Sequence, residues 1–315
     1  MTRHRVPEGP APYVGVLNLL KPPGMTSHDV IDEMRRVLGM RRIGHTGTLD
    51  PGACGVLVCC LGLATRIAEF LTDQRKGYRA EFTFGVATDT GDAYGAITGE
   101  ADASSLDRGT VEAALAGFLG EFDQVPPMVS AVHKGGQRLY KVARRGDVVE
   151  VAPRRVEITE CRLLDFVPGP RPRALVQVEC SKGTYIRALA RDLGGRLGSG
   201  AHASFVLRTH VGRFHLRDSL TLEEASAAVA EARLPTFLAS MDEALDHLPV
   251  VEVTAMQRHQ VLDGRPLPLF QVRGWANLPP TRPVRVRDSR GLLALARVEA
   301  GRLRPFRVLR GPGAS

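Results

Sequence analysis

Apolar and polar residues alternate strictly through "KGYRAEFTFGV" (76–86), which leaves few folds open to this chain. Successive side chains of a β-strand point to opposite faces, so this alternation predicts a strand with one buried face. The buried face would carry Tyr78, Ala80, Phe82, Phe84 and Val86. The exposed face would carry Arg79, Glu81 and Thr83. We therefore expect a sheet with at least one face packed on a core.

Other segments predict the rest of this sheet and the helices that cover it. Continuous apolar or alternating runs predict strands at 15–20, 56–62, 154–166, 173–181 and 203–214. Helical spacing of apolar residues, with caps and terminal glycines, predicts helices at 27–38, 64–71, 109–119, 182–198 and 221–232. The predicted fold class is α+β: a mixed, largely antiparallel central sheet with flanking helices, plus a small β-rich C-terminal domain.

Changes in composition divide the chain into three parts. Residues 1–13 have the character of a disordered basic tail, and 14–248 form the main domain. From about 249, short apolar stretches are mixed with prolines and arginines, which predicts a small separate domain over 249–315. Within the main domain, the region 124–155 contains paired glycines and no sustained core pattern, so we expect an exposed insertion there.

Membrane and metal-binding classes receive no support from the sequence. The first long apolar run, "VGVLNLL", ends at "KPPG", which is too short for a membrane span and lacks the flanks of a signal peptide. The five cysteines form no CxxC pair and no grouping with histidine that would suit a metal. An odd number of cysteines without disulfide spacing favours a reducing compartment, so we expect a cytoplasmic protein. Because no metal-binding motif is present, we also expect no metal or cofactor.

The net charge of +8 is concentrated in two segments. Residues 132–155 contain seven basic and two acidic residues, and residues 282–310 contain nine basic and two acidic residues. A localised positive surface of this kind is typical of proteins that bind nucleic acid. A bias toward arginine would explain why only five of the 42 basic residues are lysine, but it would not explain the clustering.

The loop "GHTGTLDPGACG" (44–55) presents a single carboxylate, Asp50, between glycines and a proline. An Asp before Pro is commonly a turn former, so structure alone could explain it. The loop lacks the spacing of a phosphate-binding motif. His45 lies five residues earlier and could suggest hydrolysis, but no GxSxG motif accompanies the pair. Flanking glycines would let a ligand approach the backbone closely, which favours a functional site.

Several motifs in order resemble those of the bacterial tRNA pseudouridine synthase B family. The loop carries the strongest resemblance, and the similarity extends over roughly residues 14–246. The other matching segments are "GVLNLLKPPGMTSHDV", "KGYRAEFTFGVATDTGD", "PPMVSAVHKGGQRLYKVARRG", "CSKGTYIRALARDLG" and "GAHASFVLRTHVGRF". Residues 249–310 resemble the family's small C-terminal RNA-binding (PUA-like) module more loosely.

The resemblance implies isomerisation of the uridine at position 55 in the tRNA T-loop to pseudouridine, by base flipping and without a cofactor. Asp50 matches the family's nucleophile, and Arg187 matches its ion-pair partner. A nearby cation keeps a buried carboxylate ionised, as a nucleophile must be. Tyr78 matches the tyrosine that stacks on the target base. Without the resemblance, Arg187 would pass for a surface arginine and Tyr78 for a core residue.

The resemblance also implies a set of substrate-binding residues. Tyr185 and Leu207 match positions that line the pocket, although either could be an ordinary core residue. His45 matches the histidine that fills the space the flipped base leaves, or else it is bonded to backbone. Lys21 has a structural or a phosphate-facing role, and Asp92 lies near the RNA or only forms a turn.

We expect the protein to be a monomer that binds the T-arm of tRNA, with 124–155 clamping the RNA and the C-terminal module on the acceptor-stem side. Two alternatives remain open. One is a non-catalytic RNA-binding or RNA-folding factor that keeps this scaffold, which the basic segments alone would permit. The other is an isomerase that acts on a different RNA, such as rRNA or a guide-RNA assembly.

Overall fold

The structure is a computed structural model that describes residues 12–127, 133–134, 137–138, 152–275, 278 and 282–309. The predicted tail at 1–13 lies outside these residues except for its last two, and most of the predicted insertion at 124–155 lies outside them too. Within the described ranges, no helix combines the length and the apolar composition that a membrane crossing requires.

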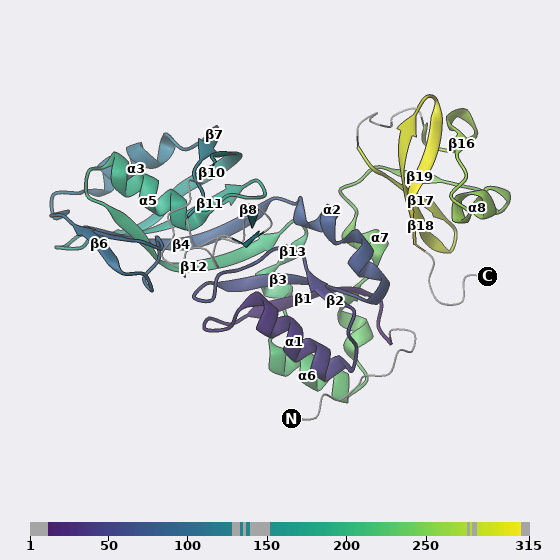
Figure 1. The fold of residues 1–315 in the computed structure, drawn as a ribbon, viewed down its shortest axis with the longest axis horizontal. Helices are drawn as coiled ribbons and strands as arrows, with labels where there is room; N and C mark the ends of the chain where they lie inside the picture. The colour runs from purple at the N-terminus through teal and green to yellow at the C-terminus, as the bar shows by residue number, and fades with distance from the viewer. Residues whose placement is uncertain are drawn as a thin grey trace.

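A ten-stranded mixed sheet forms the body of the protein (Figure 1). Its strands follow the order β14-β1-β3-β12-β4-β11-β10-β7, while β2 pairs with β3 and β13 with β12. They span Gly15–Lys21 (β1), Ile43–His45 (β2), Cys54–Leu61 (β3), Lys76–Phe84 (β4), Gly120–Gln124 (β7), Arg154–Val167 (β10), Arg173–Cys180 (β11), Ala201–Val211 (β12), Phe214–His215 (β13) and Leu238–Ala239 (β14). Every pairing is antiparallel except that of β3 with β12. The predicted α+β fold with a largely antiparallel mixed sheet is confirmed.

The parallel contact between β3 and β12 joins the two halves of this sheet. It consists of two registered pairs, Leu207 with Cys54 and Arg208 with Gly55. Gly55 has a φ of +111°, and a Cβ there would lie 2.2 Å from the carbonyl oxygen of Arg208. Only glycine allows this close approach of the two strands. The junction therefore brings the start of β3, directly after the loop that carries Asp50, against the middle of β12.

The alternation in β4 has the predicted result. Tyr78, Ala80, Phe82 and Phe84 are buried, whereas Arg79 is exposed. The buried side chains pack with residues of β10, β11 and helix α5 in one core cluster. Cross-strand neighbours on one face of a sheet contact each other, so the same face of β4 and β12 forms a continuous surface.

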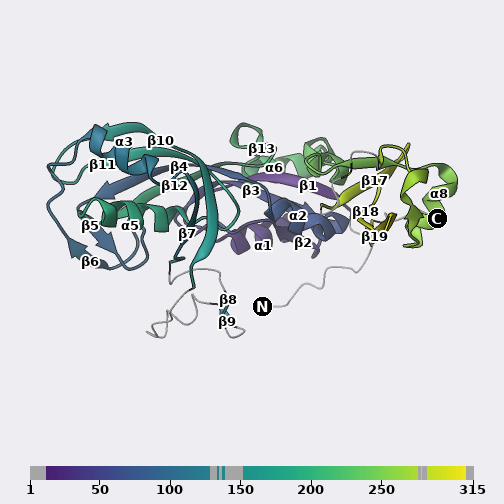
Figure 2. The ribbon, with the colours of Figure 1, turned by 90° about the horizontal axis from the view of Figure 1, so that it is seen from above.

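Helices cover the two halves of the sheet separately (Figures 1 and 2). Helix α1 begins at a capping box on Thr26 and ends at Gly39, which has a φ of +60°. It packs with α6 on the half that contains β1 and β3, and α3 and α5 pack on the other half. The helices of the body span Ser27–Leu38 (α1), Ala68–Thr72 (α2), Arg108–Ala116 (α3), Ile186–Arg196 (α5), Leu222–Ala230 (α6) and Met241–Ala244 (α7).

Shorter elements complete this region. The segment predicted as a helix at 64–71 is a 3₁₀ turn followed by the short helix α2. Two separate two-stranded sheets also occur, β5 with β6 and β8 with β9. The bounds are Val86–Thr88 (β5), Ile97–Glu100 (β6), His133–Lys134 (β8), Gln137–Arg138 (β9), and Gly62–Ile67 (η1), Leu216–Asp218 (η2) and Leu234–Phe237 (η3) for the 3₁₀ turns.

A second, five-stranded sheet lies at the C-terminal end, with the order β15-β17-β18-β19-β16. It has its own apolar core, which includes residues of helix α8. In both ribbon views this sheet lies at the end of the molecule opposite to α3 and α5 (Figure 2). The elements are Val250–Glu252 (β15), Ala255–Leu262 (α8), Leu267–Pro268 (β16), Leu269–Gln271 (η4), Val284–Asp288 (β17), Gly291–Glu299 (β18) and Arg302–Val308 (β19).

Specific contacts dock the C-terminal sheet on the body of the protein. Arg66 donates to the carbonyl of Val308 at 2.7 Å, and Arg307 donates back to the carbonyl of Arg66 at 2.6 Å. Arg307 also forms an ion pair with Glu69 at 2.8 Å. Leu295 of the second sheet joins a core cluster of the first. These reciprocal contacts fix the orientation of the two sheets.

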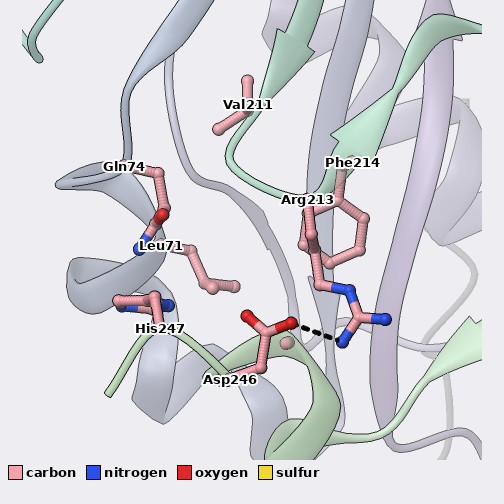
Figure 3. Close-up of a pocket in the computed structure, with 8 residues that line it drawn as sticks. Leu71, Gln74, Val211, Arg213, Phe214, Asp246 and His247 are labelled. Atoms are coloured by element: carbon pink, nitrogen blue, oxygen red, sulfur yellow. Dashed lines mark ion pairs between the residues drawn. The ribbon is translucent and has the colours of Figure 1, made fainter.

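The chain crosses between the two sheets beside a small pocket (Figure 3). Leu71 of α2, Val211 and Phe214 line the apolar side of this pocket. On its polar side, Arg213 forms an ion pair with Asp246 at 3.1 Å. The segment after α7 is therefore anchored against the β12–β13 turn just before the second sheet begins.

Candidate active site

Hydrogen bonds from two buried side chains fix the backbone of the loop between β2 and β3. The Lys21 ammonium donates to the carbonyls of Ala53 at 2.7 Å and Pro51 at 3.2 Å. Ser27 bonds both the N–H and the carbonyl of Leu49, at 2.8 and 3.1 Å. Burial lowers the pKa of Lys21 to about 8. These bonds fix the backbone on both sides of Asp50, so its carboxylate has a defined position.

The Asp50 carboxylate lies against the guanidinium of Arg187. The Arg187 Nε donates to Asp50 Oδ2 at 2.8 Å, and its Nη1 donates to the carbonyl of Thr90 at 2.6 Å. Arg187 is only 5% exposed, whereas the Asp50 side chain is 45% exposed. The arginine therefore lies behind the carboxylate and leaves it open to a ligand.

Asp92 provides a second carboxylate for the same arginine, with its Oδ2 3.4 Å from Arg187 Nη1. Its other oxygen accepts hydrogen bonds from the Thr90 hydroxyl at 2.7 Å and the Tyr94 N–H at 3.0 Å. Asp92 thus has the turn-forming role that the sequence allowed, and in addition it helps to orient Arg187.

A cavity of about 230 Å³ opens beside Asp50. Asp50, Tyr78, Tyr185 and Arg187 all line it, although they come from three separate parts of the sequence. Burial raises the pKa of Tyr78 to about 12, and the charge and hydrogen bond of Arg208 only partly oppose this rise. The Tyr78 hydroxyl is therefore protonated at neutral pH. The cavity thus combines a carboxyl group, an aromatic ring and a phenolic hydroxyl.

The start of helix α5 positions two of these residues. The Tyr185 backbone N–H donates to Gln124 Oε1 at 2.8 Å. In return, Gln124 Nε2 donates to the Tyr185 carbonyl at 3.1 Å. Because Gln124 is buried at the end of β7, this pair of hydrogen bonds fixes the turn before α5. Arg187 follows two residues later and points at Asp50.

Comparison with known proteins identifies relatives over nearly the whole chain. The family described as "TruB family pseudouridylate synthase (N terminal domain)" matches residues 35–186. A tRNA pseudouridine synthase B from Symbiobacterium thermophilum is 56% identical over 250 residues, which cover 79% of this chain and 82% of that protein. Another from Pelotomaculum thermopropionicum is 48% identical over 301 residues, covering 93% and 92%. This chain belongs to the TruB family.

The fold of this TruB family member also resembles a solved structure. The "Crystal Structure of a Cbf5-Nop10-Gar1 Complex" contains a chain with a TM-score of 0.74 and 25% identity, covering 95% of this chain and 85% of that chain. The similarity therefore includes both sheets. The family resemblance predicted from the sequence motifs is confirmed.

Four predicted site residues are not among those that line the cavity: Lys21 and Asp92, described above, and His45 and Leu207. His45 is the last residue of β2 and is registered with Cys59 of β3, so it lies at the beginning of the loop. Leu207 is not among the residues that line the cavity, and its contact with the substrate stays a prediction. A β-bulge between Ala203 and Phe205 sets the phase of β12, so Val206 and Arg208 face the cavity instead. Leu207 is registered with Arg79 and shares the opposite face.

Sequence reasoning missed three basic residues that line the cavity, Lys76, Lys182 and Arg208. Lys76 precedes Tyr78 by two residues in β4, so the alternation already placed both on one face. Arg208 lies in an alternating segment, but its inward phase depends on the bulge. In the described residues, no three His, Cys, Asp or Glu side chains lie close enough to hold a metal ion.

Proposed function

We propose that this protein converts the uridine at position 55 in the tRNA T-loop to pseudouridine, without a cofactor. The observation that supports this most directly is the Asp50 carboxylate, oriented by buried Arg187 at a cavity that also contains Tyr78. The family membership supports the same reaction. Substrate and product of this reaction are isomers, so it needs no external energy source and no redox group.

Each side chain has a role that its position supports. Asp50 acts as the nucleophile that holds one fragment while the base changes its point of attachment. Arg187 holds the Asp50 carboxylate in a fixed orientation through its hydrogen bond and opposite charge. Tyr78 stacks on the target base, and its hydroxyl takes part in proton transfer. Tyr185 packs along the cavity wall, and His45 at the edge of the loop fills the space that the flipped base leaves in the RNA.

The RNA lies across the whole length of the protein in this proposal. Residues 14–248 form the catalytic domain, residues 124–155 clamp the T-arm, and residues 249–315 contact the acceptor-stem side. Flipping favours loops, because an unpaired or weakly paired base is the easiest to extrude. In this proposal the protein works as a monomer, and it acts in the cytoplasm, where tRNA is processed.

The decisive experiment incubates the purified protein with an unmodified tRNA transcript and maps pseudouridine by position. Pseudouridine only at position 55 is the expected result. RNA binding without any pseudouridine would favour a non-catalytic RNA-folding factor. Modification of an rRNA fragment at a rate equal to that of tRNA would favour an isomerase of different substrate class.

Replacing Tyr78 with Phe separates stacking from proton transfer. Stacking of an aromatic ring on a base contributes about 1–3 kcal/mol, and Phe retains the ring, so tRNA affinity should stay within a few-fold. Loss of the hydroxyl should lower the turnover number by roughly 10²- to 10⁴-fold, as for a general acid or base. Filter binding and single-turnover kinetics on the same preparations measure the two effects. Equal losses in affinity and turnover would contradict this separation.

The affinity for tRNA should fall steeply with salt. Each phosphate contact contributes about −0.7 to −0.9 to the slope of log affinity against log salt concentration. Arg302 is an exposed residue of β19 in the second basic segment. Arg302→Gln should make the slope shallower by about 1 if this segment contacts a phosphate. A slope that does not depend on this residue would show that β19 does not contact the RNA.

A further inference from the structure

Two buried cations line the cavity, and the proposed mechanism does not yet use them. Lys76 is 6% exposed and Arg208 is 1% exposed, and both line the cavity with Tyr78. Arg208 is directly registered with Tyr78 across β4 and β12. A Cβ placed on Gly47 would lie 3.6 Å from both Arg208 Nη1 and Lys76 Cε. The two cations therefore converge on one side of the loop that carries Asp50.

Both cations are bonded to neutral groups only. Arg208 donates to the carbonyls of Val56 at 2.7 Å and Gly47 at 2.9 Å. The Lys76 ammonium donates to the carbonyls of Gln74 at 2.8 Å and Thr72 at 2.9 Å. Arg208 also shares a hydrogen bond with the neutral Tyr78 hydroxyl. Within the described part of the chain, neither cation forms an ion pair with a carboxylate.

The other two basic residues of the cavity differ in this respect. Arg187 contacts the carboxylates of Asp50 and Asp92, and Lys182 forms an ion pair with Asp73 at 2.7 Å. Burying a cation without an anionic partner is costly, and carbonyl dipoles offset only part of the cost. Burial lowers the pKa of Lys76 to about 8, which leaves most of the ammonium charged at neutral pH. This part of the cavity lining therefore carries two buried positive charges that form no ion pair.

The reaction itself generates a negative charge in this cavity. If Asp50 attacks C1′ of the ribose, an oxygen–C1′ bond forms, the N1–C1′ bond breaks, and its electron pair stays on N1 and the ring oxygens. If Asp50 attacks C6 of the base, an oxygen–C6 bond forms and the electron pair of C5=C6 moves onto C5 and O4. On either route the pyrimidine ring becomes anionic. On the first route C5 then attacks C1′ and the Asp50–C1′ bond breaks. On the second route the N1–C1′ bond breaks as C1′ moves to C5, and the Asp50–C6 bond breaks as C5=C6 forms again. On both routes C5 releases its proton, N1 gains one and the Asp50 carboxylate is regenerated.

We infer that Lys76 and Arg208 are catalytic residues that stabilise the anionic pyrimidine ring, an inference that rests on the proposed function. Fixed charges that face the site where charge develops contribute more than the same charges in water, because they need no reorganisation. Asp50 and the two cations thus have complementary roles. The carboxylate bonds covalently to a carbon of the sugar or the base, and the cations stabilise the negative charge that this leaves on the pyrimidine ring.

A structural role alone would make a different prediction. The bonds of Lys76 to α2 and of Arg208 to the loop could simply hold these segments together. In that case removing either charge would slow every substrate by the same factor. Stabilisation of an anion would instead give a larger effect with a poor leaving group than with a good one.

The experiment compares Lys76→Met with Lys76→Arg, using tRNA transcripts that carry uridine or 5-fluorouridine at the target position. Fluorine withdraws electrons and makes the ring anion more stable. Single-turnover loss of the N-glycosidic linkage is measured at saturating RNA. For uridine, Lys76→Met should lower the rate about 10²- to 10³-fold, the usual effect of removing one such group. Lys76→Arg should restore most of the rate, and Kd for the RNA should change only a few-fold.

For 5-fluorouridine the deficit of Lys76→Met should shrink by about tenfold relative to uridine. Arg208→Lys, which keeps the charge, provides a second variant if Arg208→Met does not fold. Arg79→Met is the matched control, because Arg79 is a cation of the same strand on the opposite face. It should leave the rate unchanged on both substrates.

An equal deficit on both substrates, or no deficit for Lys76→Met, would overturn the inference. Failure of the wild-type protein to form pseudouridine in tRNA would instead contradict the proposed function. The two failures are therefore distinguishable in one set of measurements.

Discussion

Replacing Asp50 with Asn should abolish turnover, while the protein keeps its fold and its affinity for tRNA. The amide has the same shape as the carboxylate, and its oxygen can still accept the hydrogen bond from Arg187 Nε. It is neutral, however, and cannot form the covalent bond that the reaction needs. We expect a loss of roughly 10³-fold or more in the single-turnover rate, as for removal of a nucleophile.

The affinity of Asp50→Asn for tRNA should remain within a few-fold of the wild-type value, because the carboxylate contributes little attraction to a polyanion. Asp102→Asn is a suitable control, since Asp102 is an exposed acid that does not line the cavity. It should be fully active. Pseudouridine formation by Asp50→Asn at an appreciable rate would falsify the assignment of Asp50 as the nucleophile.

Local patterns predicted the strands and helices well, because their causes are local. The alternation in β4 predicted which side chains are buried, and the helix predicted at 27–38 has the bounds of α1. These features depend on side-chain direction and on capping, which neighbouring residues determine. The same reasoning was less successful at 64–71, where a 3₁₀ turn precedes the helix.

Contacts between distant segments could not be derived from residue patterns. Asp50 and Arg187 are 137 residues apart, and only the family resemblance predicted that they pair. No pattern in the sequence indicated the parallel junction of β3 with β12, although Gly55 is the residue that permits it. A strand's pairing partner depends on the whole sheet, so one strand's sequence carries little information about it.

The direction of the side chains in β12 depends on a local irregularity of the strand. A shift of one residue in a strand moves every side chain to the opposite face. The bulge between Ala203 and Phe205 produces such a shift, and a bulge has no reliable signature in a single sequence. For the same reason the inward direction of Arg208 was not predictable, whereas that of Lys76 followed from the position of Tyr78 and was overlooked.

The second large effect is expected at Arg187, because one side chain holds three acceptors. Its guanidinium bonds Asp50, the Thr90 carbonyl and Asp92 at once. A lysine ammonium lacks the planar fork that reaches all three, so Arg187→Lys should not be a conservative change. We expect the turnover number of Arg187→Lys to fall roughly 10²- to 10³-fold, since misplacing a reacting group by about 1 Å costs about that much.

Removing the charge with Arg187→Met should also destabilise the fold, because it leaves two carboxylates close together without a cation. Breaking a buried ion pair costs about 3–5 kcal/mol, and the partial exposure of Asp50 should reduce this to roughly 1–3 kcal/mol. Urea unfolding measures the change. The double variant Arg187→Met, Asp92→Asn should recover part of the stability, since it removes one uncompensated carboxylate. It should recover none of the activity, because Asp50 is still without its partner. Recovery of both together would mean that Arg187 supports the site only through the stability of the fold.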